Sequence, residues 1–392
     1  MSTMETVPFS SLQLINDVTT SLPPLPMFAV NPRVYEQFDF VVNMILTPIL
    51  CVLGLVGNSV GLYVIGKDPS SKKHTIYTYM FSLMAFDILF LLLGLVTGAL
   101  DILEHYDAYL VNKIKAYSWA YKGYCTVVLK HMGSVLLIIM TLERWMSLVF
   151  PCHVKQSYLS RNPKTIVTVS FVVSAVYIIP FTAGFTVLET TDARNRTIYA
   201  NGIDQNYFPV FYIYTYIETT VLHYLAPAFV LVFNILTVVS YSRFVKKRSS
   251  LGKRHMSDNQ TKITFVVCCV AGLYILLSLP NIFVQTLIFI NDDYSFYGRY
   301  NLTFDLFIQL GDFLARINAA ADFFIYILVS NHFRSVFNSM LFKGDSERSR
   351  SRSSVSNEKQ NVSTVNTKKS FDNIVGGKNN TINASTNSFH DI

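Results

Sequence analysis

An acid and a base stand side by side near the end of a long apolar run, at Glu143 and Arg144. Ionised groups at membrane depth cost several kcal/mol unless they pair or face a polar cavity, so such residues are functional candidates. Pro151, shortly after the pair, is expected to stop or kink the helix. Two interpretations are open: the pair belongs to a functional site, or Arg144 is an anchor that reaches lipid phosphates.

Other ionisable residues lie inside apolar runs, namely Lys130, His131, Glu218, His223, Asp312 and Arg316. Asp312 and Arg316 are four residues apart on one helical face, so one interpretation is that they neutralise each other. The alternative is that they face a ligand cavity. Glu218 and His223 are expected to pack against neighbouring helices, with a binding role as the alternative.

The composition indicates what carries these residues. Of 392 residues, 51% are hydrophobic and only 15% are charged, and the mean hydropathy is positive. This balance is too apolar for one or two soluble domains and predicts a polytopic membrane protein. The net charge of +7 then matters by its distribution among the loops, and is no sign of nucleic-acid binding. Five cysteines predict no disulfide framework, and the first 35 residues contain no cleaved signal peptide.

Seven segments are long and apolar enough to span a membrane, which takes about 20 residues. Each lacks alternating polarity and must satisfy its own backbone hydrogen bonds in lipid, so each is predicted to be a helix. The predicted spans are Phe40 to Gly66, Thr75 to Leu100, Tyr117 to Phe150, Thr165 to Leu188, Tyr207 to Ser242, Ile263 to Ile290, and Leu306 to Val329. The fold class is therefore an all-α seven-transmembrane helix bundle.

The basic residues set the orientation. The loops after the first, third and fifth spans are rich in Lys and Arg, and the other loops are more acidic, so the former are cytoplasmic. The amino terminus is then outside and the carboxyl tail inside. Asn195-Arg-Thr197 becomes a glycosylation site in the second outer loop. The similar sequences at Asn259, Asn361 and Asn383 face the cytosol and stay unmodified.

The chain divides into four parts. Residues 1–39 form an extracellular amino-terminal segment, and residues 40–330 form the helix bundle. Residues 331–342 carry large apolar side chains at helical spacing and are predicted to form a short amphipathic helix on the inner membrane face. Residues 343–392 are rich in Ser, Asn, Thr and Lys and are predicted to be a disordered cytoplasmic tail. Its serines, near Arg348 to Arg352, are either kinase substrates or simply solvated.

Several motifs in this order resemble those of rhodopsin-like (class A) G-protein-coupled receptors. They are Gly57-Asn58, Leu83 to Asp87, Glu143-Arg144-Trp145, Pro227, Pro280, and Asp322 to Tyr326, with Phe333 following at the family's usual distance. The resemblance covers residues 40 to 342. It implies the seven-helix fold, and it identifies the amphipathic segment as an eighth helix.

The chain also departs from the family pattern. Leu277-Ser-Leu-Pro280 lacks the usual tryptophan of the sixth helix, Phe323 replaces the proline of the seventh, and the fourth helix has no tryptophan. Trp119 stands at the position of the third-helix cysteine, so the family's extracellular disulfide should be missing. These changes leave the fold prediction intact but affect the details of activation.

The resemblance assigns roles to two groups of residues. The G-protein coupling switch would comprise Glu143, Arg144, Trp145 and Tyr326, with Glu143 holding Arg144 at rest and releasing it to the G protein or to Tyr326. A core polar network would comprise Asn58, Asp87, Asn318 and Asp322. There the carboxylates either bind a sodium ion that favours the resting state or share one proton.

The predicted ligand cavity is lined by Thr126, Lys130, Gln285, Asp312 and Arg316. Thr126 stands where aminergic receptors have an Asp, and Arg316 stands where opsins have the retinal lysine, so an amine ligand and a photoreceptor are both disfavoured. A peptide or a small acid remains. Acidic outer loops would attract a cationic peptide, and the aromatic stretch Tyr207 to Tyr214 could receive aromatic side chains such as those of Arg-Phe-amide peptides.

Taken together, these features predict a plasma-membrane receptor that binds an extracellular ligand, identified as a neuropeptide, and activates a heterotrimeric G protein. The chain is similar to invertebrate receptors for FMRFamide-related peptides. It would be no enzyme and need no cofactor beyond the sodium ion, and its tail would serve arrestin and receptor kinases. The alternatives are a chemosensory receptor for small molecules, a transporter or channel, and a receptor that has lost signalling.

Overall fold

The computed structural model describes residues 30–67, 75–104, 106–150, 157–191, 195–250, 258–291, 293–294, 298–329, 333–335 and 337–339. Within these ranges the side chains of 247–250, 258–262, 288–289 and 329 are not described. The chain forms two compact units, Met1–Arg334 and Ser335–Ile392. The spanning helices and the β-hairpin all belong to the first unit.

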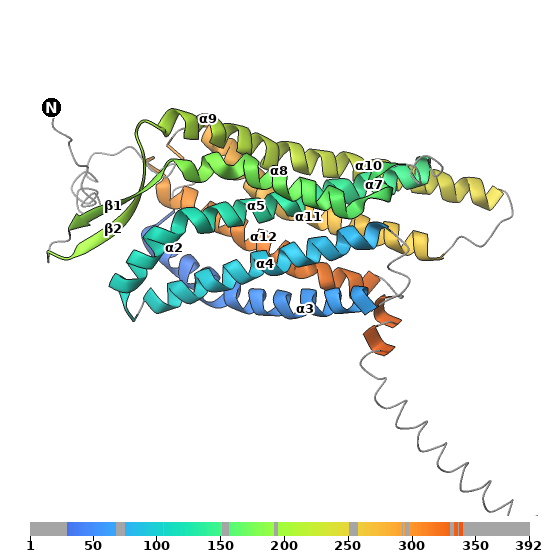
Figure 1. Cartoon of the computed structure of the whole chain (residues 1–392), viewed down its shortest axis with the longest axis horizontal. Helices are drawn as coiled ribbons and strands as arrows, with labels where there is room; N and C mark the ends of the chain where they lie inside the picture. The colour runs from blue at the N-terminus through green and yellow to red at the C-terminus, as the bar shows by residue number, and fades with distance from the viewer. Residues whose placement is uncertain are drawn as a thin grey trace, which may run out of the picture. The chain divides into compact units, whose positions relative to one another are not determined.

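The first unit consists of long helices and one β-hairpin (Figure 1). In chain order its elements are α2 (Pro32–Asp39), η1 (Phe40–Leu46), α3 (Thr47–Lys67), α4 (Thr75–Glu104), α5 (Ala108–Val149), α7 (Tyr158–Arg161), α8 (Pro163–Ala183), β1 (Phe185–Thr191), β2 (Thr197–Ile203), α9 (Phe208–Thr219), η3 (Thr220–Leu225), α10 (Ala226–Ser250), α11 (Asp258–Ile290) and α12 (Asn301–Val329). The elements η1 and η3 are π-helical turns that continue directly into the α-helices around them.

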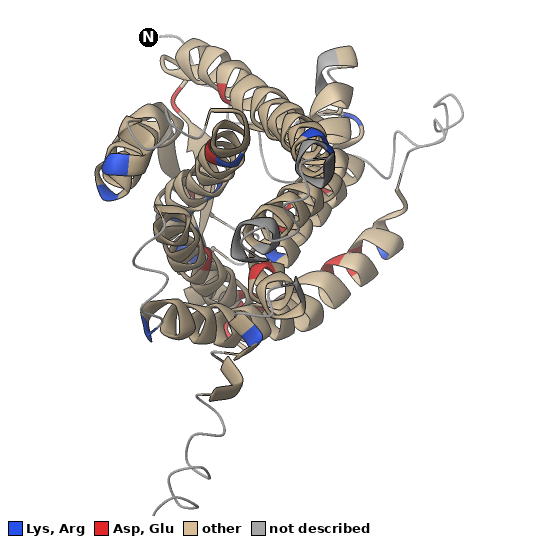
Figure 2. Ribbon diagram, turned by 90° about the vertical axis from the view of Figure 1, so that its right-hand side faces the viewer, with Lys and Arg blue, Asp and Glu red and all other residues tan. Residues whose placement is uncertain are grey.

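The helices match the predicted membrane protein. In the described ranges, six helices are long and apolar enough to cross a membrane, and α12 makes a seventh when it is counted with the helical turns at 333–339. Figure 2 views the bundle along its helices, and Lys and Arg lie at several helix ends on that side. Lys67, Arg161 and Lys164 occupy the ends of α3, α7 and α8.

Helix α5 is the central element of the bundle. It packs against α4, α8, α10 and α11, while α3 packs against α4 and α12. The hydrophobic core between α3, α4, α5 and α12 is built from Cys51, Phe90, Leu91, Leu129, Ala319 and Ala320. Because α5 contacts four other long helices, its buried polar residues lie at or near helix interfaces.

Small residues allow α3 and α12 to approach closely. A Cβ added at Gly54 would lie 2.8 Å from the Cβ of Ala320, and one added at Gly57 would lie 2.9 Å from Cδ1 of Phe323. Phe323 is the residue that replaces the family's proline, and its ring fills the space that Gly57 leaves open. The Phe323 ring is therefore accommodated because the residue opposite it on α3 has no side chain.

The first spanning helix begins at Pro32, eight residues before the predicted span. Asn31 accepts a hydrogen bond from the Arg33 amide at 2.9 Å, and Pro32 occupies the first helical turn, where its missing N–H is no loss. Val30 donates its amide proton to Thr303 Oγ1 at 3.0 Å. The last part of the predicted amino-terminal segment is thus helical and attached to α12.

The fourth span ends earlier than predicted. Residues up to Leu188 were expected to be helical, but α8 ends at Ala183 and β1 starts at Phe185. Strands β1 and β2 pair antiparallel from Phe185 opposite Ile203 to Thr191 opposite Thr197. The error arises because Phe185 to Leu188 is mostly apolar, with the β-branched residues Thr186 and Val187 inside it, and periodicity cannot separate a strand from a short helical extension.

The hairpin is held against α5 by hydrogen bonds to its backbone. Asn112 donates to the Tyr199 carbonyl at 3.0 Å and accepts from the Tyr199 amide at 2.9 Å. Trp119, at the position of the family's cysteine, packs edge-on against Phe185 of β1 at 4.5 Å between ring centroids. Aromatic packing and one amide side chain therefore connect α5 to the hairpin, where the family uses a disulfide.

Half of the predicted eighth helix lies outside the described residues. Residues 333–335 and 337–339 are helical, while 331, 332, 336 and 340–342 are not described. The amphipathic helix at 331–342 stays a prediction. The tail, with its candidate kinase sites, lies wholly outside the described residues.

Candidate functional site

Glu143 and Arg144, the pair predicted at the inner end of α5, form an ion pair. Arg144 donates from Nε and Nη2 to the same oxygen of Glu143, at 3.0 and 2.8 Å. Both side chains are nearly buried, with exposed fractions of 9% and 6%. A buried charge needs a partner, so the pair is stable only while both groups stay in place. Trp145 lies beside it and contacts Phe233 of α10 at 5.9 Å between ring centroids.

Tyr79 of α4 adds a contact that the sequence analysis missed. Its hydroxyl donates to the Leu159 carbonyl in α7 at 2.8 Å, and Thr75 donates to the Ser160 carbonyl at 3.1 Å. Tyr79 is fully buried and lies close enough to Glu143 to interact with it electrostatically. The short helix α7 is thereby fixed beside the Glu143–Arg144 pair. A tyrosine alone in an apolar run gave no signal for this role.

Tyr326 belongs with the polar core. Its side chain is fully buried and interacts electrostatically with Asp322 and Asp87. In the described part of the chain its hydroxyl has no hydrogen-bond partner, and so none to Arg144. Its role in the switch, together with the Glu143–Arg144 pair, stays a prediction.

The predicted core network forms where α3, α4 and α12 meet. Asn58 donates to the Ala319 carbonyl at 2.8 Å, and the carboxyl groups of Asp87 and Asp322 lie within hydrogen-bonding reach of each other. Several buried oxygens find no partner among the described residues. They are Asn58 Oδ1, Asp87 Oδ2, Asn318 Oδ1, Asp322 Oδ1 and the Tyr326 hydroxyl.

These unpartnered oxygens are compatible with a hard cation, which prefers oxygen ligands. No group of three or more His, Cys, Asp or Glu side chains in the described ranges could hold a metal ion. A sodium ion between Asp87 and Asp322 would therefore complete its ligands with amide or water oxygens. A shared proton is the alternative, and it would satisfy the carboxyl groups but not Asn58 Oδ1.

The centre of the predicted ligand cavity contains an ion pair between helices. Lys130 of α5 donates a hydrogen bond to Asp312 of α12. Their side chains remain partly exposed, at 21% and 34%. Asp312 and Arg316 were expected either to neutralise each other or to face the cavity, and Lys130 on the facing helix is a further partner of Asp312. Arg316 still lies close enough to act electrostatically on Asp312.

Arg316 lies against the neighbouring helices. A Cβ added at Gly94 of α4 would be 2.9 Å from Arg316 Nε and 3.0 Å from Cys51 Sγ. The Nε atom is buried and has no hydrogen-bond partner among the described residues. Thr126 and Gln285, the other predicted lining residues, are half-buried. Their contact with a ligand stays a prediction.

Lys122 is a residue that the sequence analysis could have found. It lies on α5 four and eight residues before Thr126 and Lys130, and so on the same helical face. It interacts electrostatically with Asp312 and Arg316. Three cations, Lys122, Lys130 and Arg316, thus act on Asp312, while Asp101 also acts on Lys122 and Glu218 on Lys130.

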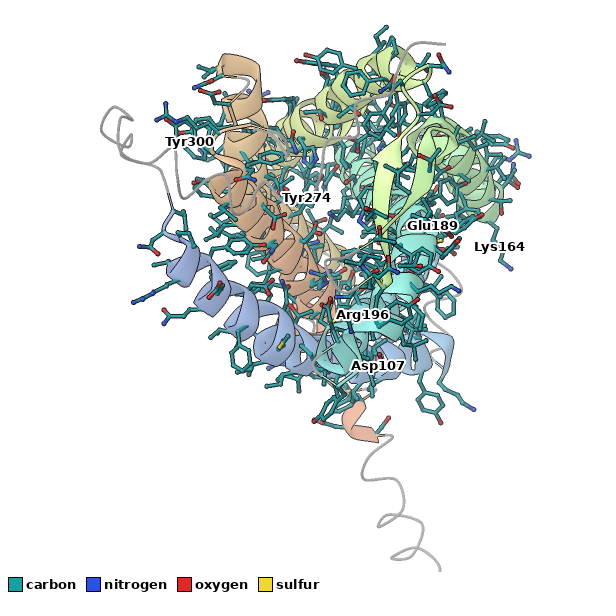
Figure 3. All side chains as sticks on the ribbon, turned by 90° about the vertical axis from the view of Figure 1, so that its left-hand side faces the viewer. Asp107, Lys164, Glu189, Arg196, Tyr274 and Tyr300 are labelled. Atoms are coloured by element: carbon teal, nitrogen blue, oxygen red, sulfur yellow. The ribbon has the colours of Figure 1, made fainter. Side chains whose placement is uncertain are left out.

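The outer end is less acidic than the sequence suggested. Lys115 forms ion pairs with Asp101 at 2.7 Å and Glu104 at 2.6 Å, so its single positive charge offsets one of the two negative charges expected to attract a cationic ligand. Figure 3 looks onto this end, with Glu189 and Arg196 labelled on the hairpin region and Asp107 at the start of α5. Asn195, the predicted glycosylation site, lies at the turn between the strands with φ of 58°.

Comparison with known proteins gives concordant results. The family model described as 7 transmembrane receptor (rhodopsin family) matches residues 57–326. A probable G-protein coupled receptor of Caenorhabditis elegans is 22% identical over 298 residues, which cover 74% of this chain and 67% of that protein. Somatostatin receptor type 2 of Mus musculus is 25% identical over 318 residues, covering 78% of this chain and 79% of the receptor.

Proposed function

Since the chain belongs to the rhodopsin family of seven transmembrane receptors, we propose that its extracellular ligand is a peptide. The protein is a multi-pass membrane receptor that signals through a heterotrimeric G protein, and it is not an enzyme. The similarity to a somatostatin receptor supports a peptide ligand. The aromatic side chains of α9, including the stacked pair Phe208 and Tyr212, offer apolar contacts at the outer end.

The observation that supports signalling across the membrane is that two basic residues of α5 are each held in an ion pair. Lys130 and Arg144 are 14 residues apart on α5, about four helical turns and about 21 Å. Lys130 is bound by Asp312 of α12, and Arg144 is bound by Glu143. A ligand group that binds Lys130 or Asp312 breaks the ion pair between them, and this loosens α12 from α5. A G protein that binds Arg144 stabilises the same rearrangement from the inner side.

The proposal also covers the orientation of the receptor, its sodium site and the partners of its tail. The amino terminus lies outside and the receptor resides in the plasma membrane. A sodium ion at Asp87 and Asp322 stabilises the resting state, and arrestin and receptor kinases act on the tail. The unpartnered core oxygens support the ion, and the basic helix ends support the orientation.

A small acid is the second candidate ligand. The three cations Lys122, Lys130 and Arg316 around Asp312 favour a carboxylate ligand, which would fit a chemosensory receptor. The transporter or channel alternative is not favoured, because the chain belongs to the receptor family.

The test is G-protein activation in cells that express the full chain, screened against pooled amidated peptides and then small acids. We expect a peptide response that Arg144→Ala reduces at least about tenfold while ligand binding persists. Arg161→Ala, a change at an exposed residue at the end of α7, serves as the matched control and should keep the response. A response to acids with none to peptides would support the second candidate. Full signalling by Arg144→Ala would remove Arg144 from the switch.

A further inference from the structure

A second polar cluster lies between α5, α8 and α9, next to the ion pair of Lys130 and Asp312. His131 of α5 and Tyr214 of α9 are buried, with exposed fractions of 5% and 7%. Tyr177 of α8 lies between them, with ring centroids 5.5 Å from His131 and 5.8 Å from Tyr214. Glu218, one turn after Tyr214, completes the cluster with its side chain 15% exposed. The switch and cavity described above use none of these four residues.

The cluster has more polar atoms than partners. Among the described residues, His131 Nε2 and the hydroxyls of Tyr177 and Tyr214 are buried without a hydrogen bond. The shortest contact of the Glu218 carboxylate with a basic group is 3.9 Å, to His131 Nε2, which is too long for a hydrogen bond. Lys130 is the next residue to His131, but its ammonium group is bound to Asp312. Buried polar groups without partners are costly, so these atoms are expected to receive one from outside the chain.

The chemistry of the four groups selects a cation with several N–H donors. Glu218 supplies a carboxylate, the tyrosine oxygens can accept hydrogen bonds, and His131 Nε2 accepts when its ring proton is on Nδ1. The faces of the Tyr177 and Tyr214 rings add cation–π attraction. A planar guanidinium group carries five donors and can reach several acceptors at once, whereas an ammonium group has three.

The cluster lies at the depth of the ligand cavity. His131 directly follows Lys130 on α5, so the two side chains differ by about 1.5 Å along the helix and point to adjacent faces. The π-helical turn η3 begins at Thr220, two residues after Glu218. Such turns interrupt regular helices and are frequent at functional sites. The cluster is therefore a neighbour of the Lys130–Asp312 ion pair on the adjacent face of α5, and Lys130 acts electrostatically on Glu218.

We propose that His131, Tyr177, Tyr214 and Glu218 form a subsite for a guanidinium group of the ligand, with Glu218 as its counter-ion. The proposal rests on the proposed function in one respect: the group belongs to an extracellular ligand. It adds the chemical class of one part of that ligand, a basic side chain of the arginine type.

The test measures thermal unfolding of the purified full-length receptor in lipid nanodiscs with two probes at millimolar concentrations. L-argininamide carries the guanidinium group, and L-citrullinamide replaces it with a neutral urea of the same shape. We expect argininamide, but not citrullinamide, to raise the melting temperature of the receptor in a saturable way. In Glu218→Gln its apparent dissociation constant should rise about tenfold or more, because one charge-assisted contact is lost. Tyr214→Phe should give a smaller rise.

Glu189→Gln is the matched control, since Glu189 is an exposed acid on β1, and it should bind argininamide as the unchanged receptor does. The quantity compared is the shift caused by the probe, so a change in the basal melting temperature of a variant does not affect the result. If Glu218→Gln does not fold, the double variant Tyr177→Phe with Tyr214→Phe keeps the carboxylate and must still weaken binding.

The proposal is overturned if citrullinamide acts like argininamide, if Glu218→Gln keeps the full shift, or if the unchanged receptor shows no shift. The measurement needs no G protein. A receptor that binds argininamide through Glu218 but never activates a G protein would keep the subsite and remove the signalling function. If a peptide response survives in Glu218→Gln and argininamide causes no shift, the signalling function is kept and the subsite is removed.

Discussion

At the scale of single residues, the polar side chains in the bundle fall into two kinds. Glu143 with Arg144 and Lys130 with Asp312 have found partners, so each pair is a closed contact that something must open. Asp87 and Asp322 instead face each other as two acids. Closed pairs hold a conformation in place, whereas facing acids call for a cation or a proton. The two kinds respond differently to substitution.

Sodium dependence distinguishes the two possibilities for the acids. Replacing potassium by sodium should stabilise the receptor by about 1.4 kcal/mol when sodium is about tenfold above its dissociation constant. Asp87→Asn should abolish this gain, because it removes one of the two carboxylates. Thermal unfolding in matched salts measures the effect. Asp305→Asn, an acid of α12 at the outer end, should keep the sodium response. If the unchanged receptor does not respond to sodium, the carboxyl groups share a proton instead.

At the scale of elements, close packing of α3 on α12 depends on Gly57. Gly57→Ala would place a methyl group 2.9 Å from Cδ1 of Phe323, and such overpacking costs about 1–3 kcal/mol. Phe323→Ala removes the obstacle, so the double variant should lose less stability than the sum of the single changes. Melting temperatures of the three variants give the coupling. Gly66→Ala is the control, because nothing lies within 4 Å of a Cβ there. Equal losses at both glycines would contradict the packing argument.

The hairpin provides a second prediction at this scale. Asn112→Ala removes both hydrogen bonds to Tyr199, so β2 should separate from α5 more often. Hydrogen–deuterium exchange of residues 197–203 should become faster, while exchange in α3 stays unchanged. Asn201→Ala, at an exposed position on the same strand, is the matched control and should have little effect. Unchanged exchange in Asn112→Ala would mean that the aromatic contacts of Trp119 hold the hairpin alone.

At the scale of the whole molecule, the orientation in the membrane predicts where sugars are attached. Asn195 lies at the hairpin turn, at the outer end, and Asn259 lies in α11 near the basic end of the bundle. Only a site on the luminal side during synthesis is glycosylated. Asn195→Gln should therefore remove a glycosidase-sensitive increase in mass, and Asn259→Gln should not. Gel mobility of receptor from animal cells measures both. A glycan lost with Asn259→Gln would reverse the predicted orientation.

The sequence by itself determined the architecture. Long apolar runs can satisfy their backbone only as helices in lipid, so the spans followed from composition and length. The Glu143–Arg144 contact also followed, because adjacent residues of opposite charge at one depth have few other partners. Where the sequence analysis failed, as at Leu188, a short apolar and β-branched stretch had two acceptable structures.

Only the tertiary structure decided which charges pair. Asp312 had Arg316 one turn away on its own helix, yet Lys130 on the facing helix reaches it, because helix packing sets distances that sequence spacing does not encode. The same holds for Gly57 opposite Phe323, and for His131, Tyr177, Tyr214 and Glu218, which come from three helices. Spans depend on local composition, while sites depend on the rotation and position of each helix against its neighbours.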